Sequence, residues 1–137
     1  MASALFVKTF ESALKNDLAL DLDNDSFKCM LVKAAYSPDF EVHTKKSQVT
    51  NEVTGTNYTA GGNAIASPTL AGSSDGNNVT WPNSTISAVR AAVIYDDSVT
   101  DKRLIAYIDF LGDFSTTSGT FQIEWNAAGI FTLDLKP

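Results

Sequence analysis

The chain has 137 residues, of which 44% are hydrophobic and 19% are charged. A chain of this length forms one domain more readily than two, and it buries about two-thirds of the surface that it exposes when unfolded. The 16 acidic residues outnumber the 10 basic ones, which gives a net charge of −6. This balance argues against nucleic acid or an anionic membrane as a partner, because affinity for either depends on clustered lysine and arginine.

Cysteine content and the N-terminal pattern suggest a reducing compartment. Cys29 is the only cysteine, so no intrachain disulfide can form, and its apolar neighbours predict a buried, unreactive thiol. The N-terminal stretch carries Lys8 and Glu11 within its apolar pattern, which is unlike a secretory signal. No stretch approaches the ~20 apolar residues of a membrane-spanning helix. We therefore expect a protein that is made and folded in a cytoplasm.

Residues Ala4 to Leu18 repeat apolar side chains with helical spacing. Phe6, Phe10 and Leu14 recur at every fourth position and would share one face of a helix. We expect a short amphipathic helix here, capped by Ser3. Its apolar stripe can cover the domain's own sheet or dock on another subunit, and the sequence leaves both alternatives open.

The acidic stretch from Asp21 to Ser26 resembles the start of a calcium-binding EF-hand loop, which places oxygen ligands at alternate positions. The rest of that motif is missing. Its sixth position is Ser26 instead of glycine, and its twelfth is Val32 instead of glutamate. We interpret this stretch as a solvated acidic turn and predict no metal site.

Residues Phe27 to Ala35 predict the first long strand. Apolar side chains stand on both of its faces, with Cys29 and Leu31 on one and Met30 and Val32 on the other. A strand of this kind is buried on both sides. We expect it to lie inside the sheet.

The stretch from Asn78 to Phe110 predicts a meander of three strands. Val79 and Trp81 alternate with polar neighbours, and residues that favour turns follow them. A long β-branched and apolar run comes next, as a central strand requires. The predicted order is a turn at Pro82–Ser84, a strand over Thr85–Tyr95, a turn over Asp96–Lys102 and a strand over Leu104–Phe110.

The C-terminal part predicts two more strands. Phe121, Ile123 and Trp125 alternate with polar residues, which is typical of a strand with one face in water. The predicted order is a polar turn over Gly112–Gly119, a strand ending at Trp125, a turn over Asn126–Gly129 and a closing strand over Ile130–Leu135.

Short strands separated by turn residues predict an all-β fold. We expect a single-domain β-sandwich, jelly-roll-like, with a short N-terminal amphipathic helix. A barrel is the alternative. Residues 1–137 would form one domain, with the helix and its lead-in over residues 1–18 and the sandwich over residues 27–137.

The sequence offers no convincing catalytic or cofactor-binding constellation. His43 is the only histidine, and with no second histidine it does not support the usual zinc sites. Gly55, Gly61 and Gly62 fail the phosphate-loop spacing because Asn63 stands where lysine is needed. We expect a protein that is not an enzyme and holds no cofactor or metal.

Charged residues in the strands have structural interpretations. We expect Arg90 to pair with Asp109 or Glu124, since a structural ion pair is commoner at such a position than catalysis. A glycoside hydrolase would need two carboxylates about 5 to 10 Å apart. Asp96, Asp97, Asp109 and Glu124 are candidates for that role, which we do not favour for so short a chain.

Several segments, in this order along the chain, resemble a family of small virion proteins of tailed bacteriophages. The most distinctive are G-T-N-Y-T-A-G-G at residues 55–62, V-T-W-P-N-S-T-I at residues 79–86 and W-N-x-x-G-I at residues 125–130. The resemblance covers nearly the full length. It implies a structural component of the virion.

Within that setting, the resemblance suggests a capsid cement or decoration protein. Its partner would be the major capsid protein, and its location would be the outer capsid surface after synthesis in the host cytoplasm. Homodimers or trimers would match local symmetry axes of the capsid. The alternatives are a receptor- or carbohydrate-binding module of a tail or head fibre, and a tail or head-to-tail connector component.

We expect the protein interface to involve the N-terminal helix and the region from Tyr36 to Gly62. Both have a weak strand pattern, and the second is rich in tyrosine and glycine. The candidate interface residues are Phe6, Phe10, Tyr36, Phe40 and Tyr58.

Overall fold

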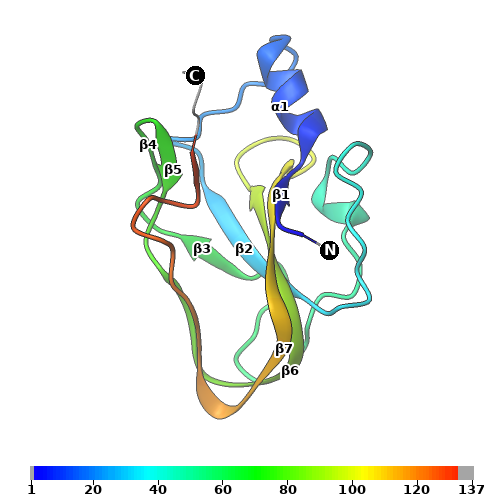
Figure 1. The fold of residues 1–137 in the computed structure, drawn as a ribbon, viewed down its shortest axis with the longest axis vertical. Coiled ribbons are helices and arrows are strands. Elements are labelled where there is room, and N and C mark those ends of the chain that lie inside the picture. Colours follow the sequence, from blue (N-terminus) through cyan, green and yellow to red (C-terminus); the bar gives the residue numbers. More distant parts are fainter. Residues whose placement is uncertain (1, 133–137) are drawn as a thin grey trace.

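The structure, a computed structural model, describes residues 2–132 of the chain (Figure 1). It is 47% strand and 8% helix, which confirms the all-β class with one short helix near the N-terminus. In chain order the elements are β1 (Ala4–Leu5), α1 (Val7–Leu14), β2 (Phe27–Val32), the 3₁₀ helix η1 (Lys46–Gln48), β3 (Asn63–Ile65), β4 (Thr69–Leu70), β5 (Ser73–Asp75), β6 (Val79–Asp96), β7 (Leu104–Ile123) and β8 (Phe131–Thr132).

The described strands form two antiparallel sheets. The larger has the order β1-β7-β6-β2-β3 and the smaller has the order β4-β5-β8. Figure 1 shows the smaller sheet beside the upper part of the larger one, with α1 above both. Neighbouring strands of the larger sheet pair antiparallel throughout.

Strands β6 and β7 form one long, bent ribbon. They have 18 and 20 residues and pair from Val79–Ile123 at one end to Tyr95–Leu104 at the other. We call the paired Val79–Trp81 and Phe121–Ile123 the first arm of the ribbon, and the paired Ala91–Tyr95 and Leu104–Asp109 the second arm. Figure 1 shows the ribbon turning between these arms at the lower end of the molecule.

The corner between the arms is built from β-bulges. The register shifts repeatedly between Trp81 and Ala91, and each shift adds one or more unpaired residues that bend the ribbon. Four non-glycine residues with left-handed backbone conformations lie near these shifts: Asn83 (φ 51°) and Ala88 (φ 55°) in β6, and Leu111 (φ 63°) and Ser118 (φ 48°) in β7.

Two predicted turns are therefore wrong. Pro82–Ser84 and Gly112–Gly119 do not reverse the chain but lie inside β6 and β7. The residues that allow a tight turn also allow a bulge, and the partner strand determines which of the two forms. The predicted strand through Trp125 ends at Ile123. The closing strand is confirmed only at Phe131–Thr132, because Leu133–Leu135 lie outside the described residues.

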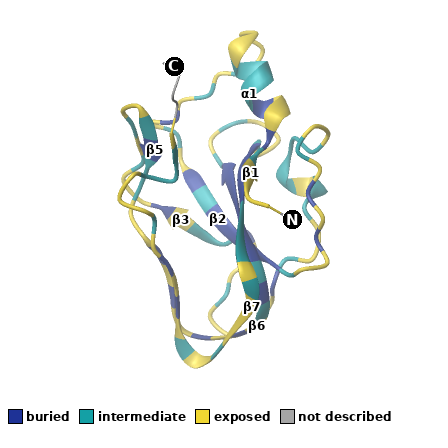
Figure 2. Ribbon diagram, viewed as in Figure 1, coloured by how far each residue is buried: buried dark blue, intermediate teal, exposed yellow. Residues whose placement is uncertain are grey.

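Burial on both faces of β2 is confirmed. Cys29 and Leu31 belong to one hydrophobic cluster, and Met30 and Val32 belong to another on the opposite face of the sheet. The strand lies between β6 and β3. Figure 2 shows this concentration of buried residues along β2 and the adjoining parts of β6 and β7.

The helix is shorter than predicted. It spans Val7–Leu14, while Ala4–Leu5 form a strand that pairs with β7. Ser3 is not a helix cap, because its hydroxyl accepts a hydrogen bond from the Asp109 amide at 2.9 Å. The open edge of β7 offers unpaired backbone groups to residues 4 and 5, and this pairing overrides their helical pattern.

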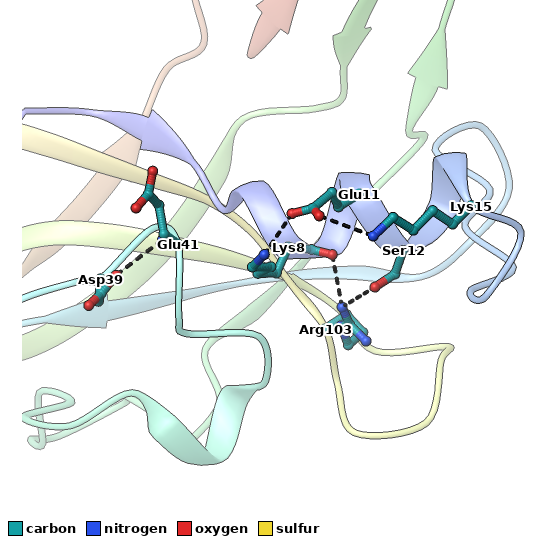
Figure 3. A network of polar contacts seen from close by, with 7 residues as sticks. All are labelled: Lys8, Glu11, Ser12, Lys15, Asp39, Glu41 and Arg103. Carbon is teal, nitrogen blue, oxygen red and sulfur yellow. Dashed lines mark hydrogen bonds and ion pairs between the residues drawn. The ribbon is translucent and has the colours of Figure 1, made fainter.

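Polar contacts of Arg103 hold α1 to the larger sheet. Figure 3 shows the guanidinium of Arg103, which donates to the Lys8 carbonyl at 3.2 Å and to the Ser12 hydroxyl at 3.1 Å. Glu11 pairs with Lys8 at 2.9 Å and with Lys15 at 3.2 Å on the solvent side. The contacts of Arg103 join the helix to the start of β7.

Two glycines, Gly62 beside β2 and Gly72 between β4 and β5, differ in how closely other atoms approach them. Gly62 (φ +77°) lies so close to the Cys29 carbonyl that a Cβ would overlap it, whereas Gly72 (φ +81°) has nothing within 4 Å of a Cβ. Gly72→Ala should cost about 1–2 kcal/mol of unfolding free energy, from backbone strain alone. Gly62→Ala should cost about 1–3 kcal/mol more. Equal losses in urea unfolding would contradict the close approach.

Candidate functional site

A groove of about 720 Å³ opens beside β7, between the two arms of the ribbon. Its apolar part comes from both arms, with Ile108 and Phe110 on one side and Phe121 and Ile123 on the other. Phe114 stands at the corner and is 52% exposed. The remaining lining residues are Ser3, Ser115, Thr116, Thr120, Gln122, Glu124, Trp125, Asn126, Gly129 and Ile130.

A second hollow extends this groove towards β1. It has a volume of about 210 Å³ and shares Ser3, Ile108 and Ile130 with the larger one. We call the two together the β7 groove. The groove follows β7 from the point where β1 pairs with it to the corner of the ribbon.

The edge of β7 that borders the groove is largely unpaired. β1 pairs with this edge only at Ala106 and Tyr107, and the Ser3 hydroxyl accepts a hydrogen bond from the Asp109 amide. Among the described strands, none pairs with this edge from Phe110 to Ile123. An open edge presents a row of backbone donors and acceptors that can pair with another extended chain.

Aromatic rings connect the mouth of the groove to the core. The ring centroids of Phe114 and Phe110 are 6.4 Å apart, and those of Phe110 and Phe121 are 6.0 Å apart. Phe121 in turn contacts Trp81 at 6.0 Å, which stacks on Tyr58 at 6.2 Å. Because the inner rings are packed against one another, the floor of the groove has a fixed shape.

The groove is nearly free of charge. Glu124 is the only acidic or basic residue that lines either hollow, although the whole chain carries a net charge of −6. Hydroxyl and amide groups form its rim. The groove therefore suits a partner surface that is apolar or polar but uncharged, since burying an unpaired charge there would be costly.

The predicted interface residues lie elsewhere. Phe6 and Tyr36 are 0% and 3% exposed, and with Phe40 they belong to the cluster on one face of the sheet. Phe10 is half-buried and meets the Phe131 ring edge-on at 5.9 Å. The hydroxyl of Tyr58 donates to Glu52 and accepts from the Leu31 amide.

These five side chains take part in the protein's own packing. In this fold the buried rings of Phe6 and Tyr36 offer no surface to a partner. Only Leu14, the last member of the predicted helical stripe, points into solvent, with 89% of its surface exposed. The structure brings together Phe6, Tyr36 and Phe40, and it places none of the five in the β7 groove.

Sequence reasoning missed the groove residues Phe110, Phe114 and Trp125. One signal was present, because Phe114 is a large aromatic residue inside a stretch that is otherwise polar. A buried turn residue and an exposed binding residue give the same local pattern. The distinction depends on the bend of the ribbon, which brings Phe110 and Phe121 to the same groove.

The lone histidine has a structural role. The Nδ1 atom of His43 accepts from the Asp39 amide at 3.2 Å and lies 3.1 Å from the Tyr36 hydroxyl, which can donate to it. Its ring stacks on that of Tyr36 with centroids 5.8 Å apart. Burial raises the pKa of Tyr36 to about 12, which keeps this hydroxyl protonated as a donor.

The predicted pairing of Arg90 is confirmed with Asp109. Arg90 Nε donates to Asp109 Oδ1 at 3.1 Å, and the carboxylate side chain is only 3% exposed. The pKa of Asp109 is lowered by the backbone amide of Leu111 and then by Arg90. This carboxylate is therefore a stable anion that fixes the corner end of the second arm.

Neither a metal-binding cluster nor a membrane helix is found in residues 2–132. No three of their histidine, cysteine, aspartate or glutamate side chains gather as metal ligands would, and none of their helices is long and apolar enough to cross a membrane. Asp21 instead accepts hydrogen bonds from the amides of Asp23 and Asn24, as in an acidic turn.

Comparison of the chain with protein-family models, curated proteins and solved structures finds no match. We therefore infer the function from the sequence resemblance and from the geometry of the groove.

Two positions of the N-terminal helical stripe separate packing from surface exposure. Phe6→Ala should lower the unfolding free energy by about 3–5 kcal/mol, because it empties a fully buried site. Leu14→Ala should change it by less than about 0.5 kcal/mol, because Leu14 is exposed. Urea unfolding of both variants measures the difference. A stable Phe6→Ala variant would mean that this ring is not a core residue.

Proposed function

We propose that the protein is a structural component of a bacteriophage virion, most specifically a capsid cement or decoration protein. In this role it binds the outer surface of the head and bridges neighbouring major capsid subunits. The segments that resemble small virion proteins of tailed phages support the setting. The observation that carries the binding role is the open edge of β7 beside an aromatic groove with Glu124 as the one charged residue in its described lining.

The occupant of the β7 groove would be an extended segment of the major capsid protein. Such a segment would add to β7 beyond Phe110 as another strand, with main-chain hydrogen bonds supplying affinity. Alternate side chains of the segment would enter the groove and pack on Phe114 and Phe121. Apolar or small polar side chains fit this environment better than charged ones do.

Repetition would compensate for a modest individual contact. A capsid presents many identical sites, so a dimer or trimer of this chain would bind several at once. Linked contacts gain effective concentration without any new interaction. We therefore propose a homo-oligomer on the capsid lattice, with the major capsid protein as its partner.

We also propose that the two sheets form a jelly-roll-like sandwich. Leu70 in the smaller sheet, and Ile130 and Phe131 at its other edge, pack against the cluster that contains Trp81 and Phe121. Two antiparallel sheets that share a core in this way support a sandwich.

A binding role suits the groove better than a catalytic one. Glycoside hydrolysis uses two carboxyl groups about 5 to 10 Å apart, whereas Glu124 is the only carboxylate in the lining of the described groove.

Carbohydrate binding is the second candidate. Trp125 and Phe114 provide aromatic surfaces beside the amides of Gln122 and Asn126, and sugars bind to such combinations. The protein would then be a receptor-binding module of a tail or head fibre. A glycan array tests this candidate, since reproducible sugar binding that is lost in a Trp125→Ala variant would favour it over cement. A tail or connector component would keep the virion setting and change the partner.

The copy number of the protein in purified virus particles tests the cement proposal directly. We expect hundreds of copies distributed over the head, because a cement protein occupies repeated lattice positions. Quantitative mass spectrometry measures the number, and labelled antibody in electron microscopy locates the copies. A few copies at the tail would overturn the head assignment, and absence from the particle would overturn the virion proposal.

Substitution at the groove tests the contact surface. Phe114→Asp places a charge at the mouth of the groove, and we expect binding to cement-free capsids to weaken at least about tenfold. Leu14→Asp is the control, because Leu14 is 89% exposed on α1 and lines neither hollow of the groove. Sedimentation of capsids with each variant measures binding. Equal affinities for the two variants would exclude the groove as the contact.

A further inference from the structure

A buried carboxyl group lies at the end of β6, away from the β7 groove. Asp96 is the last residue of that strand and is 0% exposed. Among the described residues it is the only acidic or basic side chain buried to this extent. Its Oδ1 atom accepts a hydrogen bond from the Ser98 amide at 2.9 Å, but its Oδ2 atom has no partner among the protein's donors. A buried carboxylate oxygen without a donor is costly.

The group that faces Asp96 is another carboxyl, that of Asp25, and the hydrogen bond between the two side chains is one cause of the raised pKa of Asp96. Ionised carboxylates only accept hydrogen bonds, so two of them can bond to each other only through a proton. One shared proton would give the buried Oδ2 atom its missing partner. It would also remove one of two like charges next to the buried carboxyl of Asp96.

The cations near this pair have other partners. Lys28 on β2 and Lys102 in the β6–β7 loop both pair with Asp97, at 3.6 and 3.0 Å. Arg103 directs its guanidinium to α1, as Figure 3 shows, and only its carbonyl meets the Asp96 amide. Asp97 lies next to the pair and is acidic itself. No positive charge in these described contacts neutralises Asp96, which leaves the proton.

The carboxyl pair lies between two segments that are distant in sequence. The Asp97 amide donates to the Ser26 carbonyl at 2.7 Å, and the Ser26 amide donates to the Ser98 hydroxyl at 2.7 Å. Asp25 is itself fixed, because its Oδ2 atom accepts from the Asp21 amide at 3.0 Å. The acidic turn is thus attached to the end of β6 through a small set of contacts centred on the pair.

We propose that the Asp25–Asp96 pair is a proton-dependent clasp that holds the acidic turn of residues 21–26 against the end of β6. With one proton shared, the turn is fastened. When that proton leaves, the buried carboxylate of Asp96 faces the partly buried carboxylate of Asp25, and the turn separates from β6. The inference is independent of the proposed virion role, since it concerns a different part of the molecule.

The direction of the pH effect follows from burial. Desolvation, and then the hydrogen bond with Asp25, raise the pKa of Asp96 to about 7, from 3.8 in an unfolded chain. Between these values the folded protein holds a proton that the unfolded chain has lost. Stability therefore falls as pH rises through this window, and the dependence ends above the folded pKa.

Asp96→Asn provides the test, because an amide resembles a permanently protonated carboxyl. Its oxygen can accept from Ser98 and its nitrogen can donate to Asp25. In urea unfolding from pH 5 to 8, the unfolding equilibrium constant of the unmodified protein should rise by up to about tenfold per pH unit below pH 7. The Asp96→Asn variant should lack this contribution, so its unfolding equilibrium constant should rise by up to about tenfold less per pH unit than that of the unmodified protein. Asp101→Asn, an exposed site in the β6–β7 loop, should keep the full slope.

A second measurement needs no variant. Amide hydrogen exchange of the unmodified protein, corrected for the intrinsic effect of pH, should show that the Asp97 and Ser26 amides lose protection between pH 6 and pH 8 more than the Val93 amide does. Equal slopes for Asp96→Asn and the unmodified protein, or unchanged protection at Asp97 and Ser26, would overturn the clasp. Recovery of protection at pH 8 on adding calcium would also overturn it, because the pair would then hold a cation in place of a proton.

Discussion

The bend in the β6–β7 ribbon is the constraint on which the rest of the fold depends. Strands of 18 and 20 residues would each extend on the order of 60 Å if they were straight. A domain of this size has a radius of gyration of only about 14 Å. The ribbon must therefore fold back on itself, and the bulges between Trp81 and Ala91 allow this without breaking the pairing of its arms. Folding back lets Trp81 and Phe121 of the first arm share a core with Ile94 and Ile105 of the second.

The bend also determines where the other strands can pair. The second arm is straight enough for β2 to pair with six consecutive residues of β6, from Ala91 to Asp96. On the other side of the ribbon, β1 pairs with only two residues of β7. The rest of that edge curves away and faces the groove, so the open edge and the aromatic groove have one cause. A flat ribbon of the same sequence would expose the edge without enclosing a groove beside it.

The sequence predicted the parts of this fold that depend on local pattern. Alternating and continuous apolar runs identified the all-β class and the two buried faces of β2, because each buried face of a strand requires apolar residues at every second position. These patterns could not distinguish a turn that reverses the chain from a bulged bend within a strand. Pro82 and Asn83 suit both, since a proline is tolerated at a bulge or on an edge and asparagine accepts a positive φ. Whether the chain reverses there is determined by β7, which lies more than thirty residues away.

Charge placement shows the same dependence on distant partners. Asp96 and Asp109 both lie in long apolar strands, and nothing in their neighbouring residues predicts opposite behaviour. In the folded chain, the Leu111 amide and Arg90 lower the pKa of Asp109, whereas burial beside Asp25 raises that of Asp96. The two carboxyls lie at opposite ends of the second arm. At the corner, beside the groove, the ion pair of Asp109 with Arg90 therefore stays charged at neutral pH. At the other end of the arm, the pKa of Asp96 is raised to about 7, so this carboxyl changes its protonation near neutral pH.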